Sequence, residues 1–86
     1  MTVRFHPHAL ERLVERGTTE EEVTATVLTG ESFPAKFGRT GFRKTFPFTS
    51  TWMGQSYDHK EVEVFAIRDG PDWLVITVLT RYHQTQ

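Results

Sequence analysis

Three side chains near the start of the chain have the types and the spacing of an anion-binding site. His8, Arg12 and Arg16 are four residues apart, so in a helix they form one stripe. Two guanidinium groups beside an imidazole can bind a phosphate, and the imidazole can take up a proton near neutral pH. Glu11 and Glu15 follow the neighbouring stripe. The same spacing therefore also allows ordinary surface ion pairs from these glutamates to His8 and Arg12.

A second group with chemical potential lies at the ends of two predicted strands. Lys60 precedes a strand predicted over 61–68, while Arg81 and Tyr82 close the next one. In an antiparallel pair, the start of one strand lies opposite the end of the other, which would bring Lys60 to Arg81 and Tyr82. These groups could hold a phosphodiester, stabilise its developing charge and transfer a proton. The alternative is a solvated lysine at the end of an ordinary strand pair.

The histidines do not form a metal-binding pattern. His6 and His8 flank a proline, whereas His59 and His83 are distant in the sequence. No carboxylate has metal-site spacing to them, and there is no HExxH motif. We therefore expect neither a metal nor another cofactor.

Length and composition exclude several classes of protein. With 86 residues the chain has room for one domain, residues 1–86, and without cysteine it has no disulfide, thiol catalysis or zinc–thiolate site. The longest apolar run, Trp73 to Ile76, is too short to span a bilayer, and the N-terminus lacks the apolar core of a signal peptide. We expect a small soluble protein of the cytoplasm without a membrane partner.

Charge is distributed unevenly along the chain. The net charge of −1 argues against a general nucleic-acid coat protein. Residues 32–60, however, carry five basic side chains against Asp58 alone, between two acidic ends. This basic middle predicts a local anion-binding face, or else an ordinary solvated surface. The candidate RNA contacts are Arg16, Arg39, Arg43 and Lys44, with Trp52 or Trp73 available to stack on a base.

Two short helices are expected near the N-terminus. The first covers 8–16, with Pro7 at its first position and Gly17 as its left-handed cap. The second begins after Thr19, in a capping box followed by glutamates, and ends at Gly30. The predicted buried stripes are Leu10, Leu13 and Val14 in the first helix and Val23, Val27 and Leu28 in the second.

After Gly30 the sequence favours strands. Aromatic residues, threonines and turn residues predict strands around 32–37, 41–48, 51–57, 61–68 and 73–82, and Thr2–Phe5 is a short strand or a lead-in. A turn is predicted at Thr49-Ser50, and a hairpin loop of about four residues at 69–72. The order predicts an α+β fold, with two N-terminal helices packed on one face of a four-stranded, or five-stranded, antiparallel sheet.

The other face of that sheet would then be open. Simple alternation places Phe65 together with Trp73, Val75 and Leu79 on this face. An exposed apolar patch of this kind is typical of an interface, with a partner protein or a second copy of the chain. The alternative is a curled sheet whose own aromatic loops cover the patch.

The order of the short motifs resembles a known family. The motifs are His8-Ala9, Arg12, Arg16-Gly17, Glu22-Val23, Gly30-Glu31, Gly38-Arg39, Tyr57-x-x-Lys60-x-Val62-x-Val64, and Val75-Ile76-Thr77 through to Tyr82. Together they resemble small bacterial domain-of-unknown-function proteins that open with an HA…R…R pattern and are distantly grouped with RelE/ParE and BrnT-like toxins. The resemblance implies a RelE/ParE-like fold and the toxin of a toxin–antitoxin pair, with an antitoxin as partner.

The resemblance also implies two kinds of activity. RelE-like members cleave mRNA through the ribose 2′-OH without a metal, whereas ParE-like members act on gyrase. As a nuclease, this chain would use His8 or Tyr82 as the base, and Arg12, Lys60 and Arg81 to stabilise the pentavalent phosphate. The chain departs from the RelE pattern in being slightly acidic and in lacking an obvious C-terminal helix. The alternative is a non-catalytic module that binds a partner, or a gyrase-like target, through the exposed sheet face.

Overall fold

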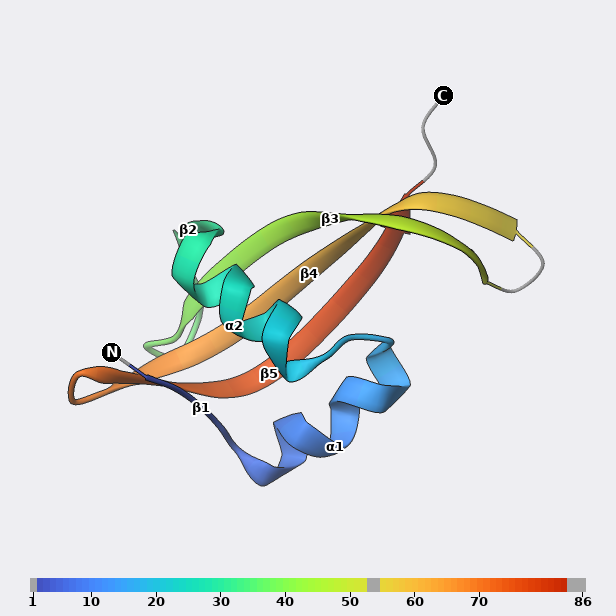
Figure 1. The fold of residues 1–86 in the computed structure, drawn as a ribbon. Coiled ribbons are helices and arrows are strands. Elements are labelled where there is room, and N and C mark those ends of the chain that lie inside the picture. Colours follow the sequence, from blue (N-terminus) through green and yellow to red (C-terminus); the bar gives the residue numbers. More distant parts are fainter. Residues whose placement is uncertain (1, 53–54, 84–86) are drawn as a thin grey trace.

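One five-stranded sheet carries both helices on the same face (Figure 1). This computed structural model describes residues 2–52 and 55–83, without the side chains of residues 48–57. The elements in chain order are β1 (Val3–Phe5), α1 (Pro7–Arg16), α2 (Glu20–Thr29), β2 (Glu31–Pro34), β3 (Thr40–Trp52), β4 (Gln55–Asp69) and β5 (Asp72–His83). The α+β architecture with two N-terminal helices is therefore confirmed.

The sheet is mixed rather than purely antiparallel. Its strand order is β1-β5-β4-β3-β2, and every neighbouring pair is antiparallel except β1 with β5. Val3–Phe5 runs parallel to Trp73–Val75, so the segment predicted as a strand or a lead-in is a strand. The first strand therefore pairs with the last one, and β5 lies between β1 and β4.

Local capping sets the ends of both helices. The side chain of His6 accepts a hydrogen bond from the backbone N–H of His8 at the start of α1, and Gly17 closes the helix at φ 70°. Thr19 caps α2 by accepting from the N–H of Glu22 at 3.2 Å. Glu22, the acidic member of the capping box, does not complete the box, because its carboxylate binds Lys60 instead.

The core lies between the helices and three central strands. It consists of Ala9, Leu13, Val23, Val27, Phe42, Val62, Val64, Ala66, Val75 and Val78. Three residues of the predicted stripes are instead exposed, namely Leu10, Val14 and Leu28. In α1, the small Ala9 lets the helix approach the sheet. In α2, the fully buried Thr26 takes a core position, and its hydroxyl donates a hydrogen bond to the carbonyl of Glu22.

The hairpins differ in detail from the predicted turns. β3 continues through Thr49 and Ser50 to Trp52, with a register shift after Pro47, so these residues form no turn. The predicted strand at 51–57 is accordingly divided between β3 and β4. At the other end of β4, Asp69 pairs with Asp72, which leaves Gly70-Pro71 as a two-residue loop.

An irregularity in β5 changes which side chains face the helices. Phe65 pairs with Thr77 and Ala66 with Val75, so Ile76 is an extra residue between them. An extra residue reverses the alternation on either side of it. Trp73 and Val75 therefore share the helix-covered face with Val78, whereas Leu79 lies on the open face.

The predicted open patch must be corrected accordingly. Val75 is fully buried, and the ring of Trp73 packs edge-on against Phe42 with centroids 5.0 Å apart. Simple alternation failed at these two positions because it assumes an unbroken strand. Of the predicted patch, Phe65 and Leu79 remain on the open face.

Candidate functional site

The His8–Arg12–Arg16 stripe of α1 lines a groove beside β5. The other lining residues are Ile76, Thr77 and Val78, and the volume is about 320 Å³. No carboxylate is among these lining residues. Arg16 is half-buried, and its Nε atom is buried without a hydrogen-bond partner among the described residues. We refer to this hollow as the α1–β5 groove.

The glutamates of α1 pair with two members of the stripe from its outer side. Nδ1 of His8 lies 3.8 Å from Glu11, and Arg12 lies 3.5 Å from Glu15. All four side chains are more than half exposed. Pairs this exposed contribute little stability, so an anion in the groove can compete for the same donors.

Lys60 does not contribute to the groove. Its side chain is only 6% exposed, and Nζ donates to the carbonyl of Gly17 at 2.9 Å and to Oε1 of Glu22 at 2.7 Å. The hydroxyl of Thr18 donates to the same carboxylate oxygen at 2.9 Å. Lys60 therefore ties the α1–α2 junction to β4 and is not exposed to a substrate.

Tyr82 and Arg81 lie on opposite faces of β5. Tyr82 is opposite Lys60 in the sheet, as expected, and its hydroxyl donates to the carbonyl of Arg16 at 3.3 Å. Arg81 points to the open face, where it pairs with Glu61 at 3.4 Å and Glu63 at 3.0 Å. Successive residues of a strand point to opposite faces, so Arg81 cannot join Lys60 and Tyr82 around one phosphate.

The basic middle of the chain is also dispersed. Arg39 lies in the turn before β3, where its backbone bonds to Lys36 and Ala35. Arg43 lies on the open face with its guanidinium 4.7 Å from the centre of the Phe33 ring. Lys44, as the next residue, points to the helix-covered face. The side chain of Trp52 lies outside the described residues.

On the open face, charged and apolar residues are direct neighbours, since Arg43 lies over the Phe33 ring and Glu63 is the register partner of Leu79. Phe33 packs edge-on against Phe65, with ring centroids 6.1 Å apart, and Leu79 is only partly exposed. Nearby, Glu63 pairs with Arg43 at 3.8 Å as well as with Arg81. The arginines on this face are therefore already paired with carboxylates.

The histidines have structural neighbours rather than a ligand set. His6 and His8 stack with centroids 5.2 Å apart, and His59 is the register partner of His83. Among the described residues there is no group of three or more histidines and carboxylates that could hold a metal ion. Nor does the described part of the chain contain a helix long and apolar enough to cross a membrane.

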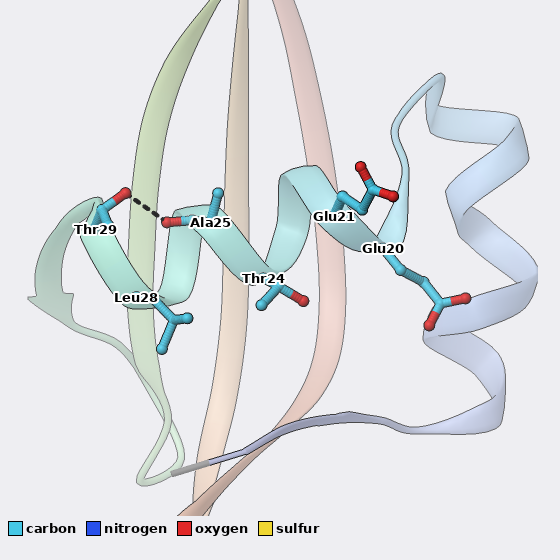
Figure 2. Close-up of a pocket in the computed structure, with 6 residues that line it drawn as sticks. All are labelled: Glu20, Glu21, Thr24, Ala25, Leu28 and Thr29. Atoms are coloured by element: carbon cyan, nitrogen blue, oxygen red, sulfur yellow. Dashed lines mark hydrogen bonds between the residues drawn. The ribbon is translucent and has the colours of Figure 1, made fainter.

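A second hollow lies on the outer side of α2. Figure 2 shows its lining residues, Glu20, Glu21, Thr24, Ala25, Leu28 and Thr29, all from that one helix. The hydroxyl of Thr29 donates a hydrogen bond to the carbonyl of Ala25 at 2.8 Å. Because no other element contributes a side chain, no polar groups converge here, and the α1–β5 groove is the better candidate site.

Comparison of the chain with protein-family models, curated proteins and solved structures finds no match. The candidate site therefore depends on the geometry of this chain. The helical spacing of His8, Arg12 and Arg16 identified the α1 side of the groove. The β5 side of the groove, formed by Ile76, Thr77 and Val78, was missed. Nothing in the sequence indicates that α1 lies beside this part of β5.

Proposed function

We propose that the protein binds RNA in the α1–β5 groove and acts as the toxin of a bacterial toxin–antitoxin pair. The observation that carries the RNA proposal is the convergence of His8, Arg12 and Arg16 on one groove without a lining carboxylate. The toxin proposal rests on the family resemblance, and the partner would be a cognate antitoxin.

The groove has the donors that a phosphodiester requires. The guanidinium groups of Arg12 and Arg16, which both line the groove, can each donate to phosphate oxygens. The surface pairs of Arg12 and His8 with glutamate are weak enough to be replaced. A single-stranded backbone is the favoured occupant, because neighbouring phosphates can follow the stripe along the helix.

Cleavage would depend on His8. As a neutral imidazole, it could accept the proton of a ribose 2′-OH while that oxygen attacks the adjacent phosphorus and the bond to the 5′ oxygen breaks. Arg12 and Arg16 would stabilise the charge on the phosphoryl oxygens. Lys60 and Arg81 have no place in this scheme, and the leaving 5′ oxygen would take its proton from water or from the protonated imidazole.

The binding experiment measures affinity for a labelled single-stranded RNA over a range of salt concentrations. Each phosphate contact contributes a slope of about −0.7 in a plot of log affinity against log salt. Arg16→Gln should weaken binding about tenfold and reduce that slope, since it removes a charged donor. Lys36→Gln is the matched control, because it removes the same charge from an exposed turn outside the groove. Equal effects of the two substitutions, or no binding at low salt, would contradict the proposal.

The activity experiment follows growth and transcript integrity after induced expression. Growth arrest with cleaved transcripts, abolished by His8→Ala in a folded protein, would support a nuclease. Growth arrest with intact transcripts would instead point to a protein target, such as gyrase. Normal growth at good expression would contradict the toxin assignment.

A second candidate function is a non-catalytic protein-binding module. It is favoured by the partly exposed Phe33, Phe65 and Leu79 on the open face of the sheet. Replacing Phe65 or Leu79 with serine should then abolish growth arrest without changing RNA affinity. Retained arrest in both folded variants would argue against this candidate.

A further inference from the structure

The outer edge of β5 is only partly covered. β1 pairs with Trp73, Leu74 and Val75, and the backbone bonds on this side run from Trp73 to Thr2 and from His6 to Val75. Beyond Val75, no strand within residues 2–52 and 55–83 pairs with this edge. The segment Thr77–Arg81 therefore presents backbone donors and acceptors along its outer side, and a strand edge of this kind is a template for another strand.

The covering strand ends for a local reason. Pro7 opens α1 directly after β1, so the chain leaves the plane of the sheet and continues on the helix-covered face (Figure 1). α1 then runs beside β5 without pairing with it. The uncovered edge is therefore built into the connection between β1 and α1.

The open edge and the basic groove are adjacent. Thr77 and Val78 belong to the first part of the uncovered edge and also line the α1–β5 groove. A strand added to this edge must consequently pass the stripe formed by His8, Arg12 and Arg16. Its side chains on the helix side would meet an imidazole and two guanidinium groups, which favours carboxylates at those positions.

The same charges disfavour a second copy of this chain. A symmetric pairing of two β5 edges, about an axis normal to the sheet, would bring the two α1 helices to the same face. Arg12 and Arg16 of each copy would then lie near those of the other, and like charges at an interface are unfavourable. Charge complementarity selects a different, acidic segment.

We infer that the β5 edge binds an extended acidic segment of a partner protein, which adds to the sheet as a sixth strand. Its backbone would pair along Thr77–Arg81, and its carboxylates would lie in the α1–β5 groove. Backbone pairing would provide affinity, and alternate side chains would provide specificity. This inference requires the strand edge and does not depend on RNA binding.

The test uses the full chain and a labelled, end-capped octapeptide that alternates glutamate with valine. Three matched probes accompany it: the same peptide with lysine for glutamate, the same peptide with N-methylated backbone amides, and a single-stranded RNA. Affinity is measured by fluorescence anisotropy. Amide hydrogen exchange, measured residue by residue, locates the bound peptide on the strand.

The expected result is binding of the glutamate peptide with slowed amide exchange within Thr77–Arg81. Neither the lysine peptide nor the N-methylated peptide should bind. Arg16→Gln should weaken binding about tenfold, as expected for one charge-assisted contact, while Lys36→Gln should leave it unchanged. The protection pattern reports on pairing directly, which a change in protein stability would not reproduce.

Several results would overturn the inference. Glutamate-peptide binding without protection of β5 amides would show an ionic contact and no added strand. Equal affinity for the lysine peptide would show that the groove does not select acidic side chains. RNA binding in the absence of peptide binding would leave the RNA proposal standing and refute this one, whereas the reverse result would refute the RNA proposal alone.

Discussion

Replacing Lys60 with methionine tests the structural role assigned to this residue. Methionine is similar in length, so it can fill the same buried space without the charge. The substitution removes the bonds from Nζ to the carbonyl of Gly17 and to the carboxylate of Glu22, at 2.9 and 2.7 Å. It does not alter the α1–β5 groove, to which Lys60 does not contribute.

The expected loss of stability depends on which partners the Glu22 carboxylate keeps after the substitution. Removing one partner of a buried ion pair costs about 3–5 kcal/mol when the other charge is left without compensation. Glu22 is 25% exposed and keeps the hydroxyl of Thr18 at 2.9 Å, so part of its charge stays solvated or bonded. We therefore expect Lys60→Met to lower the free energy of unfolding by about 2–3 kcal/mol. For a domain of this size, that corresponds to a fall in Tm of roughly 8–24 °C.

The assay is urea unfolding followed by circular dichroism. Lys36→Met is the control, because Lys36 is exposed in the turn between β2 and β3. The double variant Lys60→Met with Glu22→Gln should recover part of the loss, because it removes the unpaired carboxylate. A change of less than about 0.5 kcal/mol in Lys60→Met, the range of ordinary surface substitutions, would refute the reasoning. So would a double variant less stable than Lys60→Met alone.

Three glycine substitutions are followed by thermal unfolding: those at Gly17 and Gly41 probe close contacts, and the one at Gly38 is a control. Gly17 and Gly38 share a φ of +70°, but a Cβ at Gly17 would lie 2.5 Å from the hydroxyl of Tyr82, whereas one at Gly38 would meet nothing within 4 Å. Gly38→Ala should therefore lower the free energy of unfolding only by the backbone strain, about 1–2 kcal/mol. Gly17→Ala should lower it further, and a Tyr82→Phe background should reduce this additional loss. Equal losses for the two substitutions would contradict the contact between Gly17 and Tyr82. Gly41→Ala should also be destabilising, because its Cβ would collide with the ring of Phe33. A Phe33→Ala background should remove most of this loss of stability. An unchanged loss in that background would show that the ring is not responsible.

The helices could be predicted because their signals are local. Pro7, Gly17 and Thr19 each act within one turn of the helix end, so the sequence near the end determines the boundary. The strand that completes the sheet was less predictable. Whether Thr2–Phe5 pairs at all depends on β5, which is some 70 residues further along the chain.

The candidate site could be predicted only in part, for two physical reasons. The i, i+4 spacing of His8 and Arg12 is a property of one helix. Which strand lies beside that helix depends instead on the order of the strands in the sheet, which is set by long-range pairing. The face of each side chain in β5 depends on the extra residue Ile76, which alternation does not reveal. Lys60 was misread for a similar reason, because its burial depends on the α1–α2 junction packed above it.

The position of β5 has a consequence for biosynthesis. β5 is the last described strand to be made, yet it separates β1 from β4 and contributes Val75 and Val78 to the core. Neither β1 nor the groove side of α1 has its partner until this strand has left the ribosome. The helical hairpin and the β2–β4 sheet therefore remain incomplete until then, and the domain closes in one late step in which β5 pairs with β4 on one side and with β1 on the other.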